Sequence, residues 1–238
     1  MRIFLAGASG AIGRRLTPLL LAAGHDVTGS TRTEKVAREL ESAGLHGVVA
    51  DVFDADGLTR AVVAARPEVV IHQLTDLPRV FDEQELAAAY PRNARIRIEG
   101  TRNLVAAAQA AGARRFIVQS VAFAYAAGRE PHVETDPLNT ADGPRVVTVR
   151  AAADMEQRVL ASGMESVVLR YGLLYGPGTW TEGPARKPPV HVDAAAHAAF
   201  LTVTRGSGIY NIADEDGTVS IEKARRELGF DPGFRLPA

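Results

Sequence analysis

The chain opens with Met-Arg-Ile-Phe-Leu-Ala-Gly-Ala-Ser-Gly-Ala-Ile-Gly (residues 1–13), in which a short apolar run leads into three glycines spaced three residues apart. The run at 3–5 is typical of a buried strand, and apolar residues recur at the helical period after it. Glycines at these positions let the chain turn tightly, let backbone N–H groups approach a pyrophosphate, and let the helix pack closely on the strand. A plain strand-to-helix turn needs one glycine rather than three, so the stretch predicts a dinucleotide-binding turn.

Strand patterns and helical patterns alternate along the rest of the chain. The strand patterns lie at 27–30, 47–50, 69–74, 116–120, 167–171 and 209–212. The helical patterns between them lie at 34–43, 58–65, 96–111 and 155–161. This alternation implies right-handed βαβ crossovers, so we expect an α/β fold with a Rossmann-type, doubly wound parallel sheet.

Composition excludes several classes of protein. The formal net charge of the 238 residues is -1, so bulk charge attracts the chain neither to nucleic acid nor to acidic membranes. The absence of cysteine excludes disulfides, thiol nucleophiles and cysteine metal sites, and we expect no metal. No apolar run approaches the roughly 20 residues of a membrane span. Because the N-terminus already reads as a core strand, we expect no signal peptide and a cytoplasmic protein.

Further stretches carry a family resemblance. They are Gly100-Thr101-Arg102-Asn103-Leu104, Arg115 to Ser120, Leu169-Arg170-Tyr171-Gly172-Leu173-Leu174-Tyr175-Gly176-Pro177-Gly178, His191-Val192-Asp193 and Lys223 to Phe230. Together with the opening turn they resemble the extended short-chain dehydrogenase/reductase family, in particular its NAD-dependent epimerase/dehydratase members. The resemblance implies a Rossmann domain over 1–172, to which 192–213 returns, and a small substrate region over 173–191 and 214–238. It also implies a possible homodimer through the long helices after the fourth and fifth strands.

Two departures from the family pattern qualify this resemblance. The connections at 180–191 and 214–223 are shorter than usual, so either the substrate region is shortened or those loops are absent from the sequence given. Family enzymes use a Tyr-x-x-x-Lys pair in which the lysine lowers the tyrosine pKa for proton exchange. No tyrosine of this chain is followed four residues later by lysine, and Thr148 and Ala152 occupy the positions of the pair. The chain therefore resembles the atypical branch that lacks this dyad.

The end of the second strand bears on the choice between NADP and NAD. Enzymes that use NAD place an acidic residue there, because its carboxylate binds the ribose hydroxyls and repels a 2′-phosphate. This chain has Thr31 at that position and Arg32 beside it, a pair that matches a phosphate. NADP is favoured over NAD, with a solvated Arg32 as the alternative interpretation.

Other cofactor contacts follow from the strand ends. Asp51 and Val52 are expected at the adenine, although Asp51 could instead cap the helix that begins near residue 54. His72 is expected to face the packed side of its strand rather than to act as a base. The full set expected to bind the cofactor is Gly7, Ser9, Gly10, Ala11, Ile12, Gly13, Thr31, Arg32, Asp51, Val52, Gln73, Leu74, Thr75, Gln119 and Tyr171.

The remaining polar residues suggest the chemistry. Ser120 can donate a hydrogen bond to a substrate carbonyl, and Tyr125 is expected to border the substrate, so these two are the candidate catalytic residues. His191 and Asp193 are read as a strand end and a helix cap rather than as a site. The leading hypothesis is an NADP(H)-dependent oxidoreductase that reduces a small-molecule carbonyl or an activated alkene. A non-catalytic dinucleotide-binding sensor or scaffold, and a sugar-nucleotide epimerase or dehydratase, are the alternatives.

Overall fold

The computed structural model describes residues 1–78, 80–143 and 145–237. Within these residues a seven-stranded parallel sheet has the order β3-β2-β1-β4-β5-β6-β9. Its strands are β1 (Arg2–Ala6), β2 (Asp26–Thr31), β3 (His46–Val49), β4 (Val69–His72), β5 (Arg115–Val121), β6 (Glu165–Tyr171) and β9 (Gly208–Ile212). The strand order reverses between β1 and β4, which makes the sheet doubly wound and confirms the predicted Rossmann-type fold.

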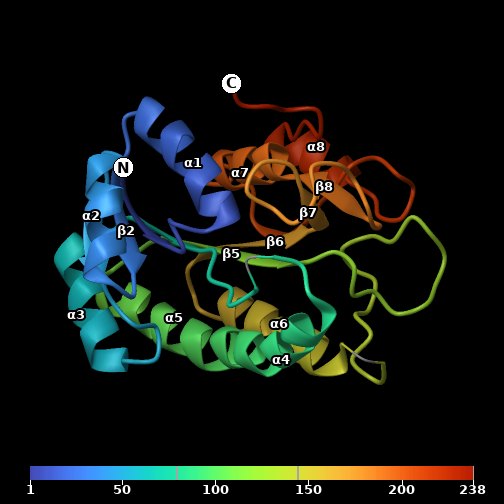
Figure 1. Cartoon of the computed structure of the whole chain (residues 1–238), viewed down its shortest axis with the longest axis horizontal. Coiled ribbons are helices and arrows are strands. Elements are labelled where there is room, and N and C mark those ends of the chain that lie inside the picture. Colours follow the sequence, from blue (N-terminus) through green and yellow to red (C-terminus); the bar gives the residue numbers. More distant parts are fainter. Residues whose placement is uncertain (79, 144, 238) are drawn as a thin grey trace.

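Helices cover both faces of this sheet (Figure 1). The helices α1 (Ala11–Ala22), α2 (Glu34–Ser42), α7 (Val192–Leu201) and α8 (Glu222–Leu228) pack on one face. On the other face lie α3 (Ala55–Ala65), α4 (Glu83–Arg95), the π-helical turn η1 (Ile96–Gly100), α5 (Thr101–Ala110) and α6 (Val146–Leu160). No helix in the described part of the chain is long and apolar enough to cross a membrane.

Alternation along the strands builds two cores. In β1, Ile3 and Leu5 belong to the core beneath α1 and α7, whereas Phe4 and Ala6 belong to the core beneath α3 and α5. All four side chains are almost completely buried. Because parallel strands are covered on both faces, they read as continuous apolar runs, and this is the pattern found in the sequence.

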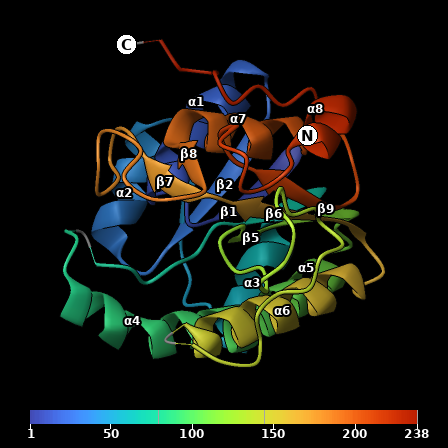
Figure 2. The same cartoon turned by 90° about the vertical axis from the view of Figure 1, so that its right-hand side faces the viewer.

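A second, smaller sheet lies beside the main one (Figure 2). It consists of β7 (Leu173–Tyr175) and β8 (Pro189–His191), which pair in parallel. The chain then returns to the main layers through α7 and β9, and the last residues run back across α7. The carboxyl ends of β1, β4, β5 and β6 meet at one edge of the main sheet, where ligands of doubly wound folds bind.

Candidate functional site

The glycine-rich turn joins β1 to α1. Gly7 has a positive φ of 97°, and a Cβ there would lie 2.7 Å from the carbonyl oxygen of Gln73. A Cβ on Gly13 would lie 2.2 Å from the carbonyl oxygen of Gly7, so both positions need glycine for the fold itself. Gly10 differs, since its φ of -75° is ordinary and the nearest atom to an added Cβ is the Gly7 oxygen at 3.3 Å. The protein leaves space beside Gly10 that a ligand could fill.

The N-terminus of α1 is open toward this space. Gly10 is its N-cap, so no side chain bonds to the first N–H groups, and the first turn contains no acidic residue. Helix N-termini with unsatisfied N–H groups bind anions through those groups and through the helix dipole. The turn therefore fits a pyrophosphate.

A cavity of about 180 Å³ extends from this turn toward β2 and β3. Of the residues expected to bind the cofactor, it brings together Gly7, Ser9, Gly10, Thr31, Arg32, Asp51, Val52, Gln73, Leu74 and Thr75. Five do not line it: Ala11, Ile12, Gly13, Gln119 and Tyr171. Ile12 and Gly13 are buried in the contact between helix and strand, while Gln119 and Tyr171 lie at the ends of β5 and β6.

A second cavity, of about 450 Å³, adjoins the first at Arg32, Thr75 and Asp76. Arg92 of α4 also lines it, and its Nε donates to Asp76 at 2.9 Å. Arg32 is exposed at the boundary between the cavities, and its side chain has no hydrogen bond or ion pair with any residue that the structure describes. Its guanidinium is therefore available to a ligand.

Asp51 and Val52 lie at the far end of the smaller cavity. The cap of α3 is Asp54, whose carboxylate accepts from the N–H of Gly57 at 3.0 Å. Asp51 instead accepts from the N–H of Phe53 at 2.9 Å, so it closes a turn and does not cap the helix. Its second carboxylate oxygen remains open to a ligand, which suits the expected contact with the adenine.

His72, at the end of β4, is completely buried. Its Nδ1 accepts from the N–H of Leu74 at 3.2 Å, so its Nε2 carries the hydrogen and donates to Thr101 at 3.0 Å. Burial, with a smaller effect from nearby Arg97, lowers the pKa of His72 to about 4. The ring is neutral and both nitrogens are used by the protein, so His72 is a packing residue.

Gln73 provides an unsatisfied acceptor in the lining of the smaller cavity. Its Nε2 donates to the hydroxyl of Tyr171 at 3.3 Å, but its buried Oε1 has no partner among the described residues. Burial raises the pKa of Tyr171, which stays neutral. Gln119 lies nearby and donates to the carbonyl of Leu74 at 2.8 Å. A buried acceptor without a donor is costly, so the site favours a ligand that donates to Gln73.

Ser120 and Tyr125 belong to one buried polar network. Ser120 Oγ donates to Glu156 at 2.5 Å, and Arg170 donates to the same carboxylate through Nε at 3.0 Å and Nη2 at 2.6 Å. Arg170 also donates to Tyr125 Oη at 2.9 Å, and Tyr125 in turn donates to Asn211 at 2.6 Å. Burial raises the pKa of Tyr125, against the opposing effect of Arg170. Both candidate catalytic hydroxyls thus have their protons bonded to acceptors of the protein.

The first turns of α6 hold the positions of the missing dyad. Thr148 and Ala152 are both buried, and Thr148 Oγ1 has no partner within the described part of the chain. The carbonyl oxygen of Thr148 accepts from Arg97 of η1 at 3.0 Å. The sequence analysis did not single out Arg97 and missed this contact. The signal that could have pointed to it is its position three residues before Gly100, where the long helix meets the sheet.

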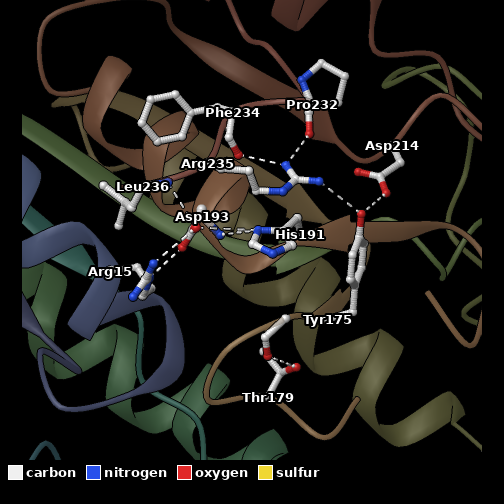
Figure 3. Close-up of polar contacts among 11 residues, drawn as sticks. Arg15, Tyr175, Thr179, His191, Asp193, Asp214, Pro232, Phe234, Arg235 and Leu236 are labelled. Atoms are coloured by element: carbon white, nitrogen blue, oxygen red, sulfur yellow. Dashed lines mark hydrogen bonds and ion pairs between the residues drawn. The ribbon is translucent and has the colours of Figure 1, made fainter. Parts of the chain in front are cut away.

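A separate polar cluster joins α1, α7 and the C-terminal segment (Figure 3). His191 ends β8, as expected, but its Nδ1 also accepts from the N–H of Asp193 at 3.1 Å, so His191 and not Asp193 caps α7. Arg15 donates to both carboxylate oxygens of Asp193, at 2.5 and 3.1 Å, and the N–H of Leu236 adds a third bond at 3.1 Å. These groups hold the two helices and the last residues together, so the cluster is structural.

The same figure shows how the small sheet is tied to this cluster (Figure 3). Tyr175 of β7 donates to Asp214 at 2.8 Å and accepts from Arg235 at 3.4 Å. Its ring also packs edge-on against His191 at 5.1 Å between centroids. Tyr175 thus links β7 to the C-terminal segment, while the other carboxylate oxygen of Asp214 is buried without a partner among the described residues.

Comparisons with known proteins agree with this geometry. The family model described as "NAD dependent epimerase/dehydratase family" matches residues 3–213. The chain is 39% identical over 267 positions to the 3-diazoavenalumate denitrifying reductase of a Streptomyces species, covering 100% of this chain and 85% of the relative. It is 28% identical to the dTDP-4-dehydrorhamnose reductase of Streptomyces griseus, covering 99% of this chain and 79% of that relative. Relatives that span the chain are thus named as reductases.

A solved structure supports the fold. The UDP-glucose 4-epimerase of Thermotoga maritima in complex with UDP-glucose superposes with a TM-score of 0.77 at 19% identity. The match covers 99% of this chain and 94% of the epimerase. The Rossmann-type architecture predicted from the sequence is therefore shared with solved members of this fold.

Proposed function

Because the chain belongs to the NAD dependent epimerase/dehydratase family, in which its full-length relatives are named as reductases, we propose that it is an NADP(H)-dependent reductase of a small molecule. The main observation in support of a preference for NADP is the Arg32 guanidinium at the boundary of the two cavities, which has no partner among the described residues. Thr31 beside it offers a hydroxyl where a carboxylate would repel a 2′-phosphate. Hydrogen bonds to charged groups contribute about 1.5–3 kcal/mol each, enough to decide between the cofactors.

Three features in and around the two cavities support the binding of a dinucleotide. The uncapped N-terminus of α1 would hold the pyrophosphate, and Asp51 and Val52 would contact the adenine. When bound, the cofactor supplies the hydride. The nicotinamide half would extend over β4, β5 and β6, where Gln73 has an unsatisfied oxygen and Tyr171 lies beside it.

The acceptor is proposed to be a carbonyl or an activated alkene, bound between the sheet edge and residues 173–191. Ser120 and Tyr125 remain the candidate hydroxyls at this end of the cleft. The name of the Streptomyces relative adds aromatic diazo compounds as a further substrate class to test. A cationic diazonium becomes neutral when it accepts hydride, so its reduction needs no proton donor.

The long helices after β4 and β5 are a proposed dimer face. Ile98 of η1 and Val147 of α6 are large apolar residues whose exposed fractions are 46% and 54%. Burying such side chains against a second copy would stabilise a homodimer by the hydrophobic effect. Sedimentation of the wild type and of an Ile98→Glu, Val147→Glu variant tests this.

The cofactor preference is tested by calorimetric titration with NADPH and NADH. We expect NADPH to bind more tightly, and Arg32→Ala to weaken NADPH roughly ten- to a hundredfold while leaving NADH nearly unchanged. Arg38→Ala serves as the matched control, because Arg38 is an exposed arginine on α2 that lines neither cavity. Thr31→Asp should reverse the preference. Equal losses for both cofactors in Arg32→Ala would contradict the assignment.

Turnover is tested by following NADPH absorbance with aldehydes, ketones, quinones, enones and aryl diazonium salts. Consumption of NADPH with at least one acceptor is expected. Tight binding without turnover on any of them would instead favour the non-catalytic sensor.

A further inference from the structure

Three of the four arginines of the helix after β4, namely Arg95, Arg97 and Arg102, face different surroundings. Arg95 is exposed, pairs with Glu99 at 2.8 Å and lies over the ring of Phe53 at 3.9 Å. Arg102 is also exposed. Arg97 is partly buried and turns toward α6. The π-helical turn explains the difference, because an extra residue in the helical turn rotates the side chains that it carries, and such turns are common at functional sites.

Arg97 lies at the ligand end of the sheet. Its partner is the carbonyl oxygen of Thr148, in the first turn of α6. Its charge acts on His72, at the end of β4, and on Glu156, which bonds to Ser120 near the end of β5. Ile96, beside it in η1, lines the smaller cavity, so the turn that carries Arg97 lies at the edge of the sheet where doubly wound folds bind their ligands.

Arg97 has hydrogen-bond donors that the protein does not use, in contrast to Arg170. Arg170 donates to Glu156, to Tyr125 and to the carbonyl of Glu134. Arg97 donates to Thr148 alone among the described residues, although a guanidinium offers donors along both of its edges. None of the remaining Arg97 donors is among the fully buried atoms that lack a partner in the described part of the chain, so they are accessible and available to an acceptor that arrives with a ligand.

The charge of Arg97 persists at neutral pH. Burial lowers its pKa to about 10, and the carboxylate of Glu156 opposes that effect. A group with this pKa is almost fully protonated at pH 7, so the side chain presents a positive charge in a weakly solvated setting, where a charge interacts strongly.

We propose that Arg97 is a catalytic residue that binds the acceptor oxygen of the substrate and stabilises the negative charge that develops there during reduction. The inference rests on the proposed function, since it requires an acceptor whose oxygen becomes negative, as in a carbonyl or an enone. Hydride adds to carbon, the electron pair of the C=O bond, or of the conjugated system, moves to oxygen, and a proton from solvent completes the product. Arg97 supplies the cation and the donors, so neither the missing lysine nor the bonded protons of Ser120 and Tyr125 are needed for this step.

The main test compares Arg97→Met with wild type on an enone or aldehyde substrate. Loss of a donor to a developing oxyanion costs about a hundred- to a thousandfold in kcat, and we expect a loss of this size. The dissociation constant of NADPH should change less than threefold, and added guanidinium ions should restore part of the rate. Arg150→Met is the matched control, because Arg150 on α6 also donates to backbone carbonyls, of Thr140 and Ala141, but is exposed. Equal kcat values for wild type and Arg97→Met would overturn the proposal.

Two further measurements separate this inference from the proposed function. Reduction of an aryl diazonium, which forms no anionic oxygen, should be unaffected by Arg97→Met, and an equal loss there would indicate a structural role. Benzoate serves as a probe of the oxyanion site in the NADP⁺ complex, and its calorimetric binding requires no turnover. We expect Arg97→Met to bind benzoate at least tenfold more weakly than wild type. If wild type binds it no better than the variant, the inference fails even where NADPH consumption shows that the protein is a reductase.

Discussion

Replacing Gly10 by alanine should abolish cofactor binding and leave the fold intact. The backbone of Gly10, with φ -75° and ψ 175°, suits any residue, and its added Cβ meets only the Gly7 oxygen, at 3.3 Å. Losing glycine at an N-cap costs up to about 1 kcal/mol, while the reduced entropy of the unfolded chain returns about 0.4–1 kcal/mol. The net change lies within about 1 kcal/mol, or roughly 2–4 °C in Tm for a protein of this size.

The effect on binding should be much larger. A methyl group at Gly10 fills the space through which the N–H groups of α1 reach the pyrophosphate. Loss of two charge-assisted hydrogen bonds at about 1.5 kcal/mol each weakens binding by more than about a hundredfold. Thermal melting and calorimetric titration with NADPH measure the two effects separately.

Gly13→Ala provides the contrast that makes the experiment decisive. Its Cβ would lie 2.2 Å from the Gly7 oxygen and 2.6 Å from the Ala8 oxygen, so the helix must move away from the strand. Overpacking of this kind costs about 1–3 kcal/mol or more, and we expect a clearly lower Tm for this variant. The reasoning is refuted if Gly10→Ala binds NADPH within twofold of wild type, or if it melts as low as Gly13→Ala.

Two further predictions follow from the buried polar groups. Tyr125→Phe removes the partner of Arg170 Nη1 and of Asn211 Oδ1. The free energy of unfolding, measured by urea denaturation, should therefore fall by about 1–3 kcal/mol. Its kcat should fall less than about a hundredfold, and a larger loss would make Tyr125 the proton donor. For His72, the pKa is about 4 in the folded protein and 6.5 for an unperturbed histidine, so between these values the unfolded chain alone binds the proton. The contribution of His72 to the free energy of unfolding should therefore be fully present above pH 6.5. It should fall by about 3 kcal/mol as the pH drops to 4. Denaturation of His72→Asn against pH should lack this contribution, and an unchanged pH slope would contradict it.

The hydrophobic periodicity of the sequence did not predict where two of the helices begin. The sequence predicts a helix from residue 96, but the structure begins it at Glu83, because Asp82 caps the turn by accepting from the N–H groups of Gln84 and Glu85. The helix expected from 155 begins at Val146. Both missed segments precede the apolar stretches whose periodicity predicted the helices. These segments are stabilised by packing between α4 and α6. The hydrophobic periodicity of a single segment contains no information about such packing between helices.

The sequence by itself determined the fold and the glycine-rich turn between its first strand and helix. The three glycines predict the turn from local sequence, because Gly7 adopts a positive φ of 97° and an added Cβ on Gly13 would meet the Gly7 and Ala8 oxygens of the same turn. The apolar runs likewise identify buried parallel strands, because burial on both faces acts on every residue of such a strand. Hence the doubly wound parallel sheet and the family could be inferred before any coordinates were known.

Only the tertiary structure decided which polar groups are free to act. Arg32 could be singled out from its place beside Thr31 at the end of a strand, but local sequence did not separate Arg97 from Arg95 and Arg102. Their roles depend on partners brought together across elements, such as the carbonyl of Thr148, 51 residues away from Arg97 in the chain. In the same way, Ser120 appears as a free hydroxyl in the sequence, but folding bonds it to Glu156. The availability of a donor depends on the acceptors that surround it in space, and local sequence does not specify these.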